Sequence, residues 1–487
     1  MANTGDRENS DCAGVRPSRR GVLLGGIAGL AAMATAGASV RTFGAEAGAA
    51  TSRVAGEKVK NLIMLVPDGM STGAVSLLDM HKRLTTGKPS FWHSLRGAKG
   101  TMHANHTTDA YESLVTDSAA ASSAWSTGIK HKIKSLCVTP DGRQPSPIFM
   151  RAKAAGYKVG CVTTTTITHA TPAGFYCNMI GRGSEAEIGQ QLIERGVDVA
   201  VGGGAKFVDP AVEAAQTAGK ANGLIVARTM MGLRAAMANP APRVLGLMSS
   251  DQIPYVLERR AASTEQFNLA EAAILAANRL AAGGKFVLQV EAGRVDHAAH
   301  NNDAPALLAE MMEFDATLEA LVGFTRATPG TLLVVVADHA TANPGLTVYG
   351  PKGQAGMEKL AAAKHSFEWM IDKVNRENEK PMRGAALAQF AELHLGIRLG
   401  ADAPGLLQSV HDARQVDPFG ARSSLIAVLG SLCGNEFGVG FVSVNHTSDA
   451  VDLLAIGAGA ESLPGMIDNT EVHEWFCGLL GLKPSIA

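Results

Sequence analysis

Short runs of apolar residues recur along the chain, and most carry apolar side chains at consecutive rather than alternate positions. A strand that is apolar on both faces is typical of a parallel sheet with helices on both sides. The runs that predict such strands lie at residues 62–66, 158–162, 197–201, 244–247, 286–290, 331–336 and 451–456. Segments with helical spacing lie between them, for example at 185–195, 264–282 and 304–324. This alternation predicts an α/β fold, a three-layer sandwich around a mostly parallel central sheet.

The alternation stops between residues 345 and 437, where helical patterns occur with little strand signal. These patterns lie at 357–376, 384–395 and 423–432. We interpret the region as a helical insertion within a domain that spans residues 58–487. It either covers one edge of the sheet or offers a surface to a partner. Surface helices without a function of their own fit the pattern equally well.

The first 49 residues differ from the rest of the chain. Arg19 and Arg20 precede a run of small and apolar residues that reaches Ala38, and small-residue cleavage patterns follow. The paired arginines resemble a twin-arginine signal, although Val22 stands where that pattern prefers phenylalanine. An ordinary secretory signal or a retained anchor fits the same residues. We expect residues 1–49 to be a signal peptide and linker, the protein to be periplasmic or extracellular, and the mature chain to have no membrane span.

Composition argues against a nucleic-acid partner and bears on the state of the cysteines. The formal net charge is −1 and 5% of the residues are aromatic, so neither a broad basic field nor a base-stacking surface predicts a nucleic-acid partner. Of the six cysteines, Cys12 lies in the expected signal, which leaves an odd number. At least one thiol is then free or bonded to another chain.

Three predicted strands end in acidic residues. Asp68 follows the run 62–66, Glu291 follows 286–290, and Asp338 with His339 follows 331–336. Because ligands bind beyond the carboxyl ends of parallel strands, these side chains are placed to bind a metal. Each segment alone also fits a turn or a helix cap.

Other segments add imidazole, hydroxyl and guanidinium groups. Asp296 and His300 are four residues apart and share a face if a helix starts there, and His446 precedes the last core strand. Carboxylate and imidazole suit zinc, whereas the hydroxyl of Thr171 suits magnesium. Arg182 can bind two phosphate oxygens with its planar fork. The mixture predicts a two-zinc site with a harder third metal.

Ser118 follows a short β-branched run and starts a stretch of small residues that favours a helix. Backbone N–H groups and the positive end of the helix dipole favour an alkoxide or an anion at that position. The neighbouring Asp117 supplies a charge that can orient Arg182. By itself the stretch fits a serine that merely caps a helix. The metal ligands elsewhere favour a nucleophile.

These motifs resemble those of the metal-dependent alkaline phosphatases and occur in that family's order. The resemblance runs from about Lys60 to the C-terminus and is poorest in the helical insertion. The motifs that carry it are Asp68-Gly69-Met70, Asp117-Ser118-Ala119, His169-Ala170-Thr171-Pro172 with Arg182, Glu291 through His300, Asp338-His339, and His446. The resemblance implies an alkaline phosphatase domain over residues 58–487, a small-molecule phosphomonoester as substrate, and a homodimer.

It also implies roles for the site residues. Ser118 is the nucleophile that forms a phosphoserine, and Arg182 binds phosphate oxygens. One Zn2+ would take Asp296, His300 and His446, the second would take Asp68, Asp338, His339 and Ser118, and Mg2+ would take Asp68, Thr171 and Glu291 with His169 nearby. His169 and His297 stand where some members have an acid and a lysine. Because imidazole favours zinc, the third metal is either Mg2+ or Zn2+.

Three alternatives share these residues. A sulfatase is disfavoured because the serine lies in Asp-Ser-Ala rather than before x-Pro-x-Arg. A phosphodiesterase stays open, since the shape of the pocket decides between monoesters and diesters. An inactive metal-binding scaffold is disfavoured because the proposed nucleophile and all proposed ligands are present.

Overall fold

A computed structural model describes residues 58–262, 265–377, 382–411 and 425–483. These residues belong to one compact unit. The expected signal peptide at 1–49 lies outside the described residues. Within the described ranges, every helix is too short or too polar to cross a membrane.

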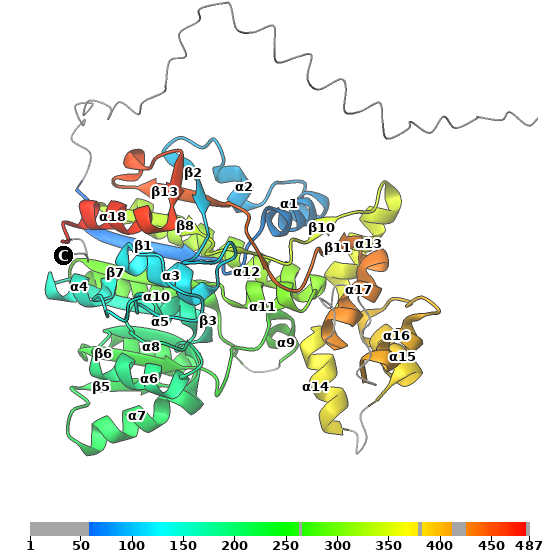
Figure 1. The fold of residues 1–487 in the computed structure, drawn as a ribbon, viewed down its shortest axis with the longest axis horizontal. Helices are drawn as coiled ribbons and strands as arrows, with labels where there is room; N and C mark the ends of the chain where they lie inside the picture. The colour runs from blue at the N-terminus through cyan, green and yellow to red at the C-terminus, as the bar shows by residue number, and fades with distance from the viewer. Residues whose placement is uncertain (1–57, 263–264, 378–381, 412–424, 484–487) are drawn as a thin grey trace, which may run out of the picture. The chain divides into compact units, whose positions relative to one another are not determined.

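A ten-stranded sheet forms the centre of this unit (Figure 1). Its strands lie in the order β14 (Met466–Asp468), β2 (Thr101–Thr107), β13 (Val451–Gly457), β8 (Thr331–Val336), β1 (Asn61–Val66), β7 (Phe286–Glu291), β3 (Lys158–Thr166), β4 (Val199–Gly203), β6 (Arg243–Leu247) and β5 (Leu224–Ala227). Strand β13 runs antiparallel to both of its neighbours, and the other pairs are parallel. The mostly parallel sheet confirms the predicted fold class.

The three strands at the middle of the sheet are buried along their whole length. Every residue of β1, β7 and β8 is buried, and removing such side chains from water stabilises the fold. The register pairs Val66 with Glu291 and Leu65 with Val335. The three strands therefore end at the same edge of the sheet.

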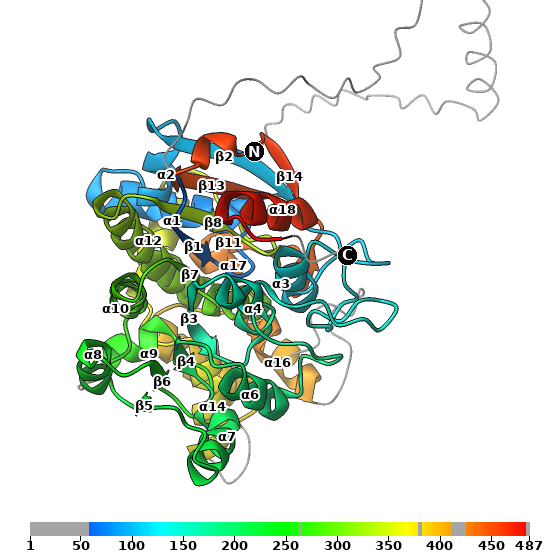
Figure 2. The same cartoon turned by 90° about the vertical axis from the view of Figure 1, so that its left-hand side faces the viewer.

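Helices cover both faces of the sheet, as Figure 2 shows. One layer contains α1 (Thr72–Thr86), α8 (Met230–Ala238), α10 (Leu269–Ala282) and α12 (Ala304–Ala327). The other contains α3 (Ser118–Thr127), α4 (Ile148–Ala154), α6 (Glu185–Glu194) and α18 (Asn469–Leu480). Shorter or peripheral helices are α2 (Phe91–Leu95), α5 (Ala170–Ala173), α7 (Ala205–Thr217), α9 (Val256–Ala261), α11 (Arg294–His300) and the 3-10 turn η1 (Ala460–Ser462).

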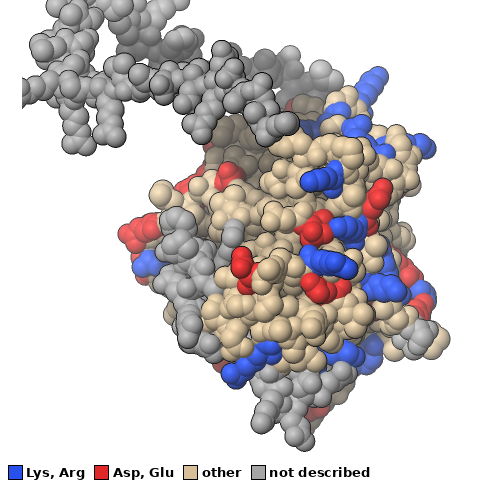
Figure 3. All heavy atoms as spheres, turned by 90° about the vertical axis from the view of Figure 1, so that its right-hand side faces the viewer, with Lys and Arg blue, Asp and Glu red and all other residues tan. Residues whose placement is uncertain are grey.

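The segment expected as a helical insertion contains α13 (Pro351–Ala362), α14 (Phe367–Glu377), α15 (Gly384–Leu395), α16 (Ala403–His411) and α17 (Leu425–Phe437). The short strands β10 (Gly345–Leu346) and β11 (Val439–Gly440) pair where the chain leaves and rejoins the sandwich. Figure 1 places these helices beyond α11, away from the edge strand β5. The role expected of them, covering an edge of the sheet or offering a surface to a partner, stays a prediction. Their side of the molecule carries interspersed acidic and basic side chains (Figure 3).

Several element boundaries differ from the sequence pattern. The pattern at 357–376 is two helices, because the chain breaks after Ala362 and Ser366 starts a new helix by accepting a hydrogen bond from Trp369 N. Strand β3 continues to Thr166 through four fully buried threonines. Strands β2, β5 and β14 were not predicted, since they are short or only partly buried. The five cysteines of the described residues are all free and buried.

Candidate active site

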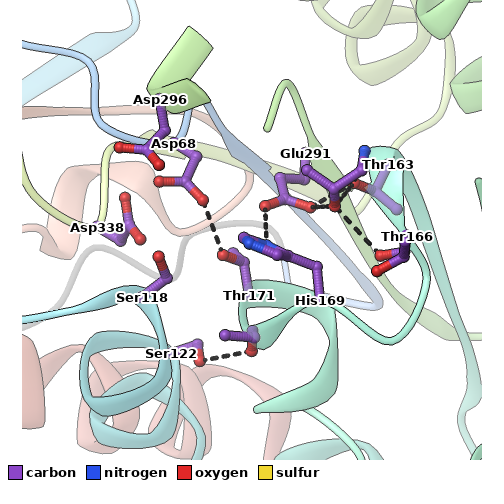
Figure 4. Close-up of polar contacts among 12 residues, drawn as sticks. Asp68, Ser118, Ser122, Thr163, Thr166, His169, Thr171, Glu291, Asp296 and Asp338 are labelled. Carbon is purple, nitrogen blue, oxygen red and sulfur yellow. Dashed lines mark hydrogen bonds and ion pairs between the residues drawn. The ribbon is translucent and has the colours of Figure 1, made fainter. Parts of the chain in front are cut away.

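Four carboxylates meet at the carboxyl edge of the sheet. Asp68 lies two residues beyond β1, Glu291 ends β7, and Asp338 lies two residues beyond β8. Helix α11 starts after a two-residue connection from β7 and brings Asp296 to the same edge. Asp68, Glu291 and Asp338 are 0% exposed. Figure 4 shows Asp68, Asp296 and Asp338 on the same side of the site as the hydroxyl of Ser118.

Ser118 is the first residue of α3 and does not cap it. The cap is Asp117, whose Oδ1 accepts a hydrogen bond from Ala120 N at 3.0 Å. The alternative in which Ser118 caps the helix is therefore wrong. Its side chain is buried, and its Oγ lies 3.3 Å from His339 Nε2. The hydroxyl thus faces the carboxylates instead of the helix.

The structure forms three groups of side chains in which the candidate ligand atoms lie within 4.8 Å of one another. These groups are Asp68, Asp338 and His339; Asp296, His339 and His446; and Asp68, His169 and Glu291. Asp68 and His339 each belong to two groups. Adjacent ions could then share ligands, as a site for paired cations requires.

His446 reaches the site on the short strand β12 (His446–Thr447), which pairs with β9 (Ala340–Thr341). Its ring stacks on that of His339 with 3.6 Å between centroids. His300 Nε2 lies 3.0 Å from His446 Nε2 and 3.4 Å from Asp296 Oδ2. The structure therefore brings together the expected set of Asp296, His300 and His446. His339, which the sequence assigned to the other zinc, also lies beside Asp296 and His446.

Backbone carbonyl contacts at Nδ1 determine which ring nitrogen carries the proton in two histidines of the site. His300 Nδ1 lies 2.5 Å from Val444 O, and His446 Nδ1 lies 2.8 Å from Thr116 O. A carbonyl oxygen only accepts, so each Nδ1 carries the proton and, in the neutral ring, Nε2 is free to bind a cation. Burial lowers the pKa of His300, but Asp296 outweighs it and raises that pKa to about 9. Burial lowers the pKa of His446 to about 4.

Several buried atoms of the site have no hydrogen-bond partner in the described structure. They are Asp68 Oδ1, Asp338 Oδ2, Glu291 Oε1 and His169 Nδ1. Burial raises the pKa of Asp68 well above its usual value, and the charges of Asp338 and Asp296 raise it further. Unpartnered buried carboxylate oxygens are costly. The residues present therefore fit divalent cations, which would neutralise and coordinate these oxygens.

The third group has mainly oxygen donors. Thr171 Oγ1 donates to Asp68 Oδ2 at 3.1 Å, and Thr165 Oγ1 donates to Glu291 Oε2 at 3.1 Å. His169 Nδ1 lies 3.5 Å from Glu291 Oε1, while His169 Nε2 accepts from Arg182 at 2.9 Å. A guanidinium only donates, so the Arg182 contact occupies the Nε2 lone pair of His169.

Residues 59–482 match the model of the alkaline phosphatase family. The chain belongs to the alkaline phosphatase family. It is 28% identical over 454 residues to alkaline phosphatase 4 of Bacillus subtilis, covering 90% of this chain and 94% of that protein. The structure of Thermus thermophilus alkaline phosphatase aligns with a TM-score of 0.79 and 33% identity, covering 88% and 92% of the two chains.

A cold-active alkaline phosphatase from Shewanella sp. aligns with a TM-score of 0.71 and 26% identity, covering 86% of this chain and 99% of that one. The protein is therefore an enzyme, a phosphatase that hydrolyses small-molecule phosphomonoesters. The family uses metal ions. In this protein the three groups of candidate ligands lie at the carboxyl edge of the central sheet.

Sequence reasoning missed several residues that hold these groups in place. Thr341 Oγ1 donates to Asp296 Oδ1 at 2.7 Å and lies 3.2 Å from His339 Nδ1. Thr163, like Thr165, donates to Glu291 (Figure 4). The run of threonines at the end of a buried strand was the available signal, because buried hydroxyls need partners.

Proposed function

We propose that this alkaline phosphatase family member hydrolyses phosphate monoesters through a phosphoserine at Ser118, with two Zn2+ and one further cation. The observation that carries the proposal is the 3.3 Å distance from Ser118 Oγ to His339 Nε2, at the meeting point of the ligand groups. A buried hydroxyl at the start of a ten-residue helix, beside this cluster, is suited to nucleophilic attack.

We assign the cations to the residues named from the sequence. The first Zn2+ would take Asp296, His300 and His446; the second would take Asp68, Asp338, His339 and Ser118; the third cation would take Asp68, Thr171 and Glu291, with His169 beside it. When bound, the cations supply the positive charge that favours the serine alkoxide and stabilises the attacking and leaving oxygens. We propose Mg2+ for the third site, because Arg182 occupies the Nε2 of His169 and leaves mostly oxygen donors. Metal analysis that finds zinc there would contradict this assignment.

The reaction would proceed by two displacements at phosphorus. The Ser118 hydroxyl gives its proton to solvent, and its Oγ forms a bond to phosphorus as the bond to the alcohol oxygen breaks; the leaving alcohol takes a proton from solvent. Water then gives a proton to solvent and attacks the phosphoserine, the bond to Oγ breaks, Oγ takes a proton from solvent, and inorganic phosphate leaves. Arg182 binds two phosphate oxygens throughout, and Asp117 fixes its guanidinium through a 3.1 Å contact. Such transfer depends on positioning and charge more than on side-chain acid–base catalysis.

Replacing the nucleophile tests the proposal. Ser118→Ala should lower turnover by several orders of magnitude while metal content stays largely unchanged, because three other residues would still hold the second Zn2+. A matched control is Ser122→Ala, one turn further along the same helix, where the hydroxyl donates to Ala170 O at 3.1 Å. Mass spectrometry of acid-quenched enzyme should place phosphate on Ser118. Undiminished turnover of Ser118→Ala would overturn the proposed nucleophile.

Substrate preference is a second test. Arg182 favours a terminal phosphate with three free oxygens, so the zinc-loaded enzyme should hydrolyse a monoester faster than a matched diester. Preference for the diester would favour the phosphodiesterase alternative.

We also propose that the protein is exported through the signal at residues 1–49 and is a homodimer. Fractionation of cells that produce an Arg19→Lys/Arg20→Lys variant should find the chain retained in the cytoplasm. Sedimentation of the exported protein should give the mass of two chains. Normal export of the variant, or a single-chain mass, would contradict the corresponding proposal.

A further inference from the structure

The first turn of α14 is attached to the part of the sandwich that carries the active site. Phe367 N donates to Asp303 Oδ2 at 2.5 Å, and Ser366 N donates to Glu258 Oε1 at 2.8 Å. The Phe367 side chain is 0% exposed. The position of the next residue, Glu368, is therefore set by contacts on both sides of the helix start.

Glu368 reaches a buried arginine at the start of α11. Arg294 Nη2 donates to both carboxylate oxygens of Glu368, at 3.0 and 3.1 Å. The Arg294 side chain is 3% exposed, and its guanidinium carbon lies 3.7 Å from the centre of the Tyr255 ring. A buried guanidinium needs an opposite charge nearby. The insertion supplies that charge through Glu368.

Arg294 also contacts His297, a histidine close to His169 and the phosphate-binding Arg182. Its Nη1 lies 2.6 Å from His297 Nδ1. Because a guanidinium only donates, His297 Nδ1 accepts and the ring proton is on Nε2. The His297 ring packs edge-on against His169, with 5.5 Å between centroids. His169 in turn accepts from Arg182.

We propose that Glu368 and Arg294 are positioning residues of the phosphate site. Glu368 of the insertion fixes Arg294, Arg294 fixes the orientation and tautomer of His297, and His297 supports His169 against Arg182. This inference rests on the proposed function, in which Arg182 binds phosphate. The insertion thereby sets the affinity of the site for phosphate, although it supplies none of the candidate metal ligands.

The affinity of the metal-loaded enzyme for phosphate tests whether Glu368 acts on Arg182. Glu368→Ala should raise the Kd for inorganic phosphate, measured by calorimetry, by about five- to tenfold, and should raise KM more than it changes kcat. The matched control is Glu358→Ala, an exposed acid on α13 of the same insertion, which should leave both constants unchanged. In a His297→Ala background, Glu368→Ala should have no further effect. Unchanged phosphate affinity, or additive effects in the double variant, would overturn the inference.

The tautomer gives a direct spectroscopic measurement. In the holoenzyme, the ¹⁵N shifts of His297 should show a protonated Nε2 and an unprotonated Nδ1, and Arg294→Met should shift this balance toward protonated Nδ1. A proton on Nδ1 in the unchanged protein would contradict the proposal. If Arg294→Met does not fold, the half-exposed Glu368 still allows the affinity test. Failure of the proposed function is distinguishable, because it appears as full turnover in Ser118→Ala, whatever the effect of Glu368.

Discussion

Asp117 connects the nucleophile's helix to the phosphate-binding arginine. Its Oδ1 caps α3, both of its oxygens accept from Lys134 N at 3.0–3.1 Å, and Oδ2 accepts from Arg182 at 3.1 Å. The carboxylate is therefore aimed at Arg182 and the backbone around Ser118. One side chain serves both the stability of α3 and the orientation of the guanidinium.

Two substitutions should separate these roles. Asp117→Asn keeps an oxygen for the cap but removes the charge, so KM should rise roughly tenfold, because a hydrogen bond between charged groups contributes about 1.5–3 kcal/mol. Asp117→Ala should also lower the free energy of unfolding by about 1 kcal/mol. Kinetics and urea unfolding measure the two effects. Thr229→Ala, which removes the cap of α8 elsewhere, should affect stability alone. An unchanged KM in Asp117→Asn would contradict the orienting role.

Between elements, the turn from α11 to α12 depends on a buried acid. Asp303 caps α12 through Ala306 N at 3.0 Å and also accepts from the first residue of α14. Burial raises the pKa of Asp303 to about 7; the charges of Glu258 and Glu368 add to this, while the two backbone hydrogen bonds oppose it. The junction between the sandwich and the insertion is therefore sensitive to pH.

Stability should show this sensitivity. Between the usual aspartate pKa of 3.8 and the folded value of about 7, native Asp303 retains a proton that the unfolded chain has released. The free energy of unfolding should therefore fall as pH rises through this window, by at most about 1.4 kcal/mol per pH unit for this group. Urea unfolding from pH 4 to 8 should show a smaller fall in Asp303→Asn. Equal slopes in both proteins would contradict the assignment.

Helix α17 approaches the same turn closely. A Cβ added at Gly430 would lie 2.5 Å from Asn302 O, whereas one added at Gly405 in α16 would meet nothing within 4 Å. Gly430→Ala should lower the free energy of unfolding by about 1–3 kcal/mol through overpacking. Gly405→Ala should raise it by about 0.5 kcal/mol, since alanine restricts the unfolded chain. Urea unfolding of the two variants measures both changes in the free energy of unfolding. If Gly430→Ala did not lower it, the close packing of α17 would be contradicted.

At the scale of the whole molecule, the active site is assembled from distant parts of the chain. Its residues extend from Asp68 to His446, and they meet because β8, β1 and β7 are adjacent in the sheet. Folding thus places several buried carboxylates against one another. Bound cations are needed to offset their repulsion and the loss of water.

Metal removal should therefore destabilise the entire domain. Dialysis against a chelator should lower Tm by at least roughly 5 °C, because ions that bind only the folded state stabilise it by mass action. Addition of Zn2+ and Mg2+ should restore Tm, in Ser118→Ala as well as in the unchanged protein. A Tm that does not respond to the chelator would contradict the presence of tightly bound cations.

The sequence predicted the parts of the site that depend on local pattern. Asp68, Glu291 and Asp338 were recognisable because each follows an apolar strand, and Ser118 because a helix starts there. It did not predict that Asp117, rather than Ser118, caps that helix, since both residue types are good caps. Strands β2 and β14 were missed because their pattern is mixed, and their strand conformation depends on neighbours more than 300 residues away.

By itself, the sequence determined the α/β class, the carboxyl edge as the place for chemistry, and the donor atoms present there. Those features follow from periodicity and from strand ends, which are local. Only the tertiary structure decided that His339 joins Asp296 and His446, that the insertion lies beyond α11, and that Glu368 reaches Arg294. Such contacts depend on how distant segments pack, and packing is settled by the whole core at once.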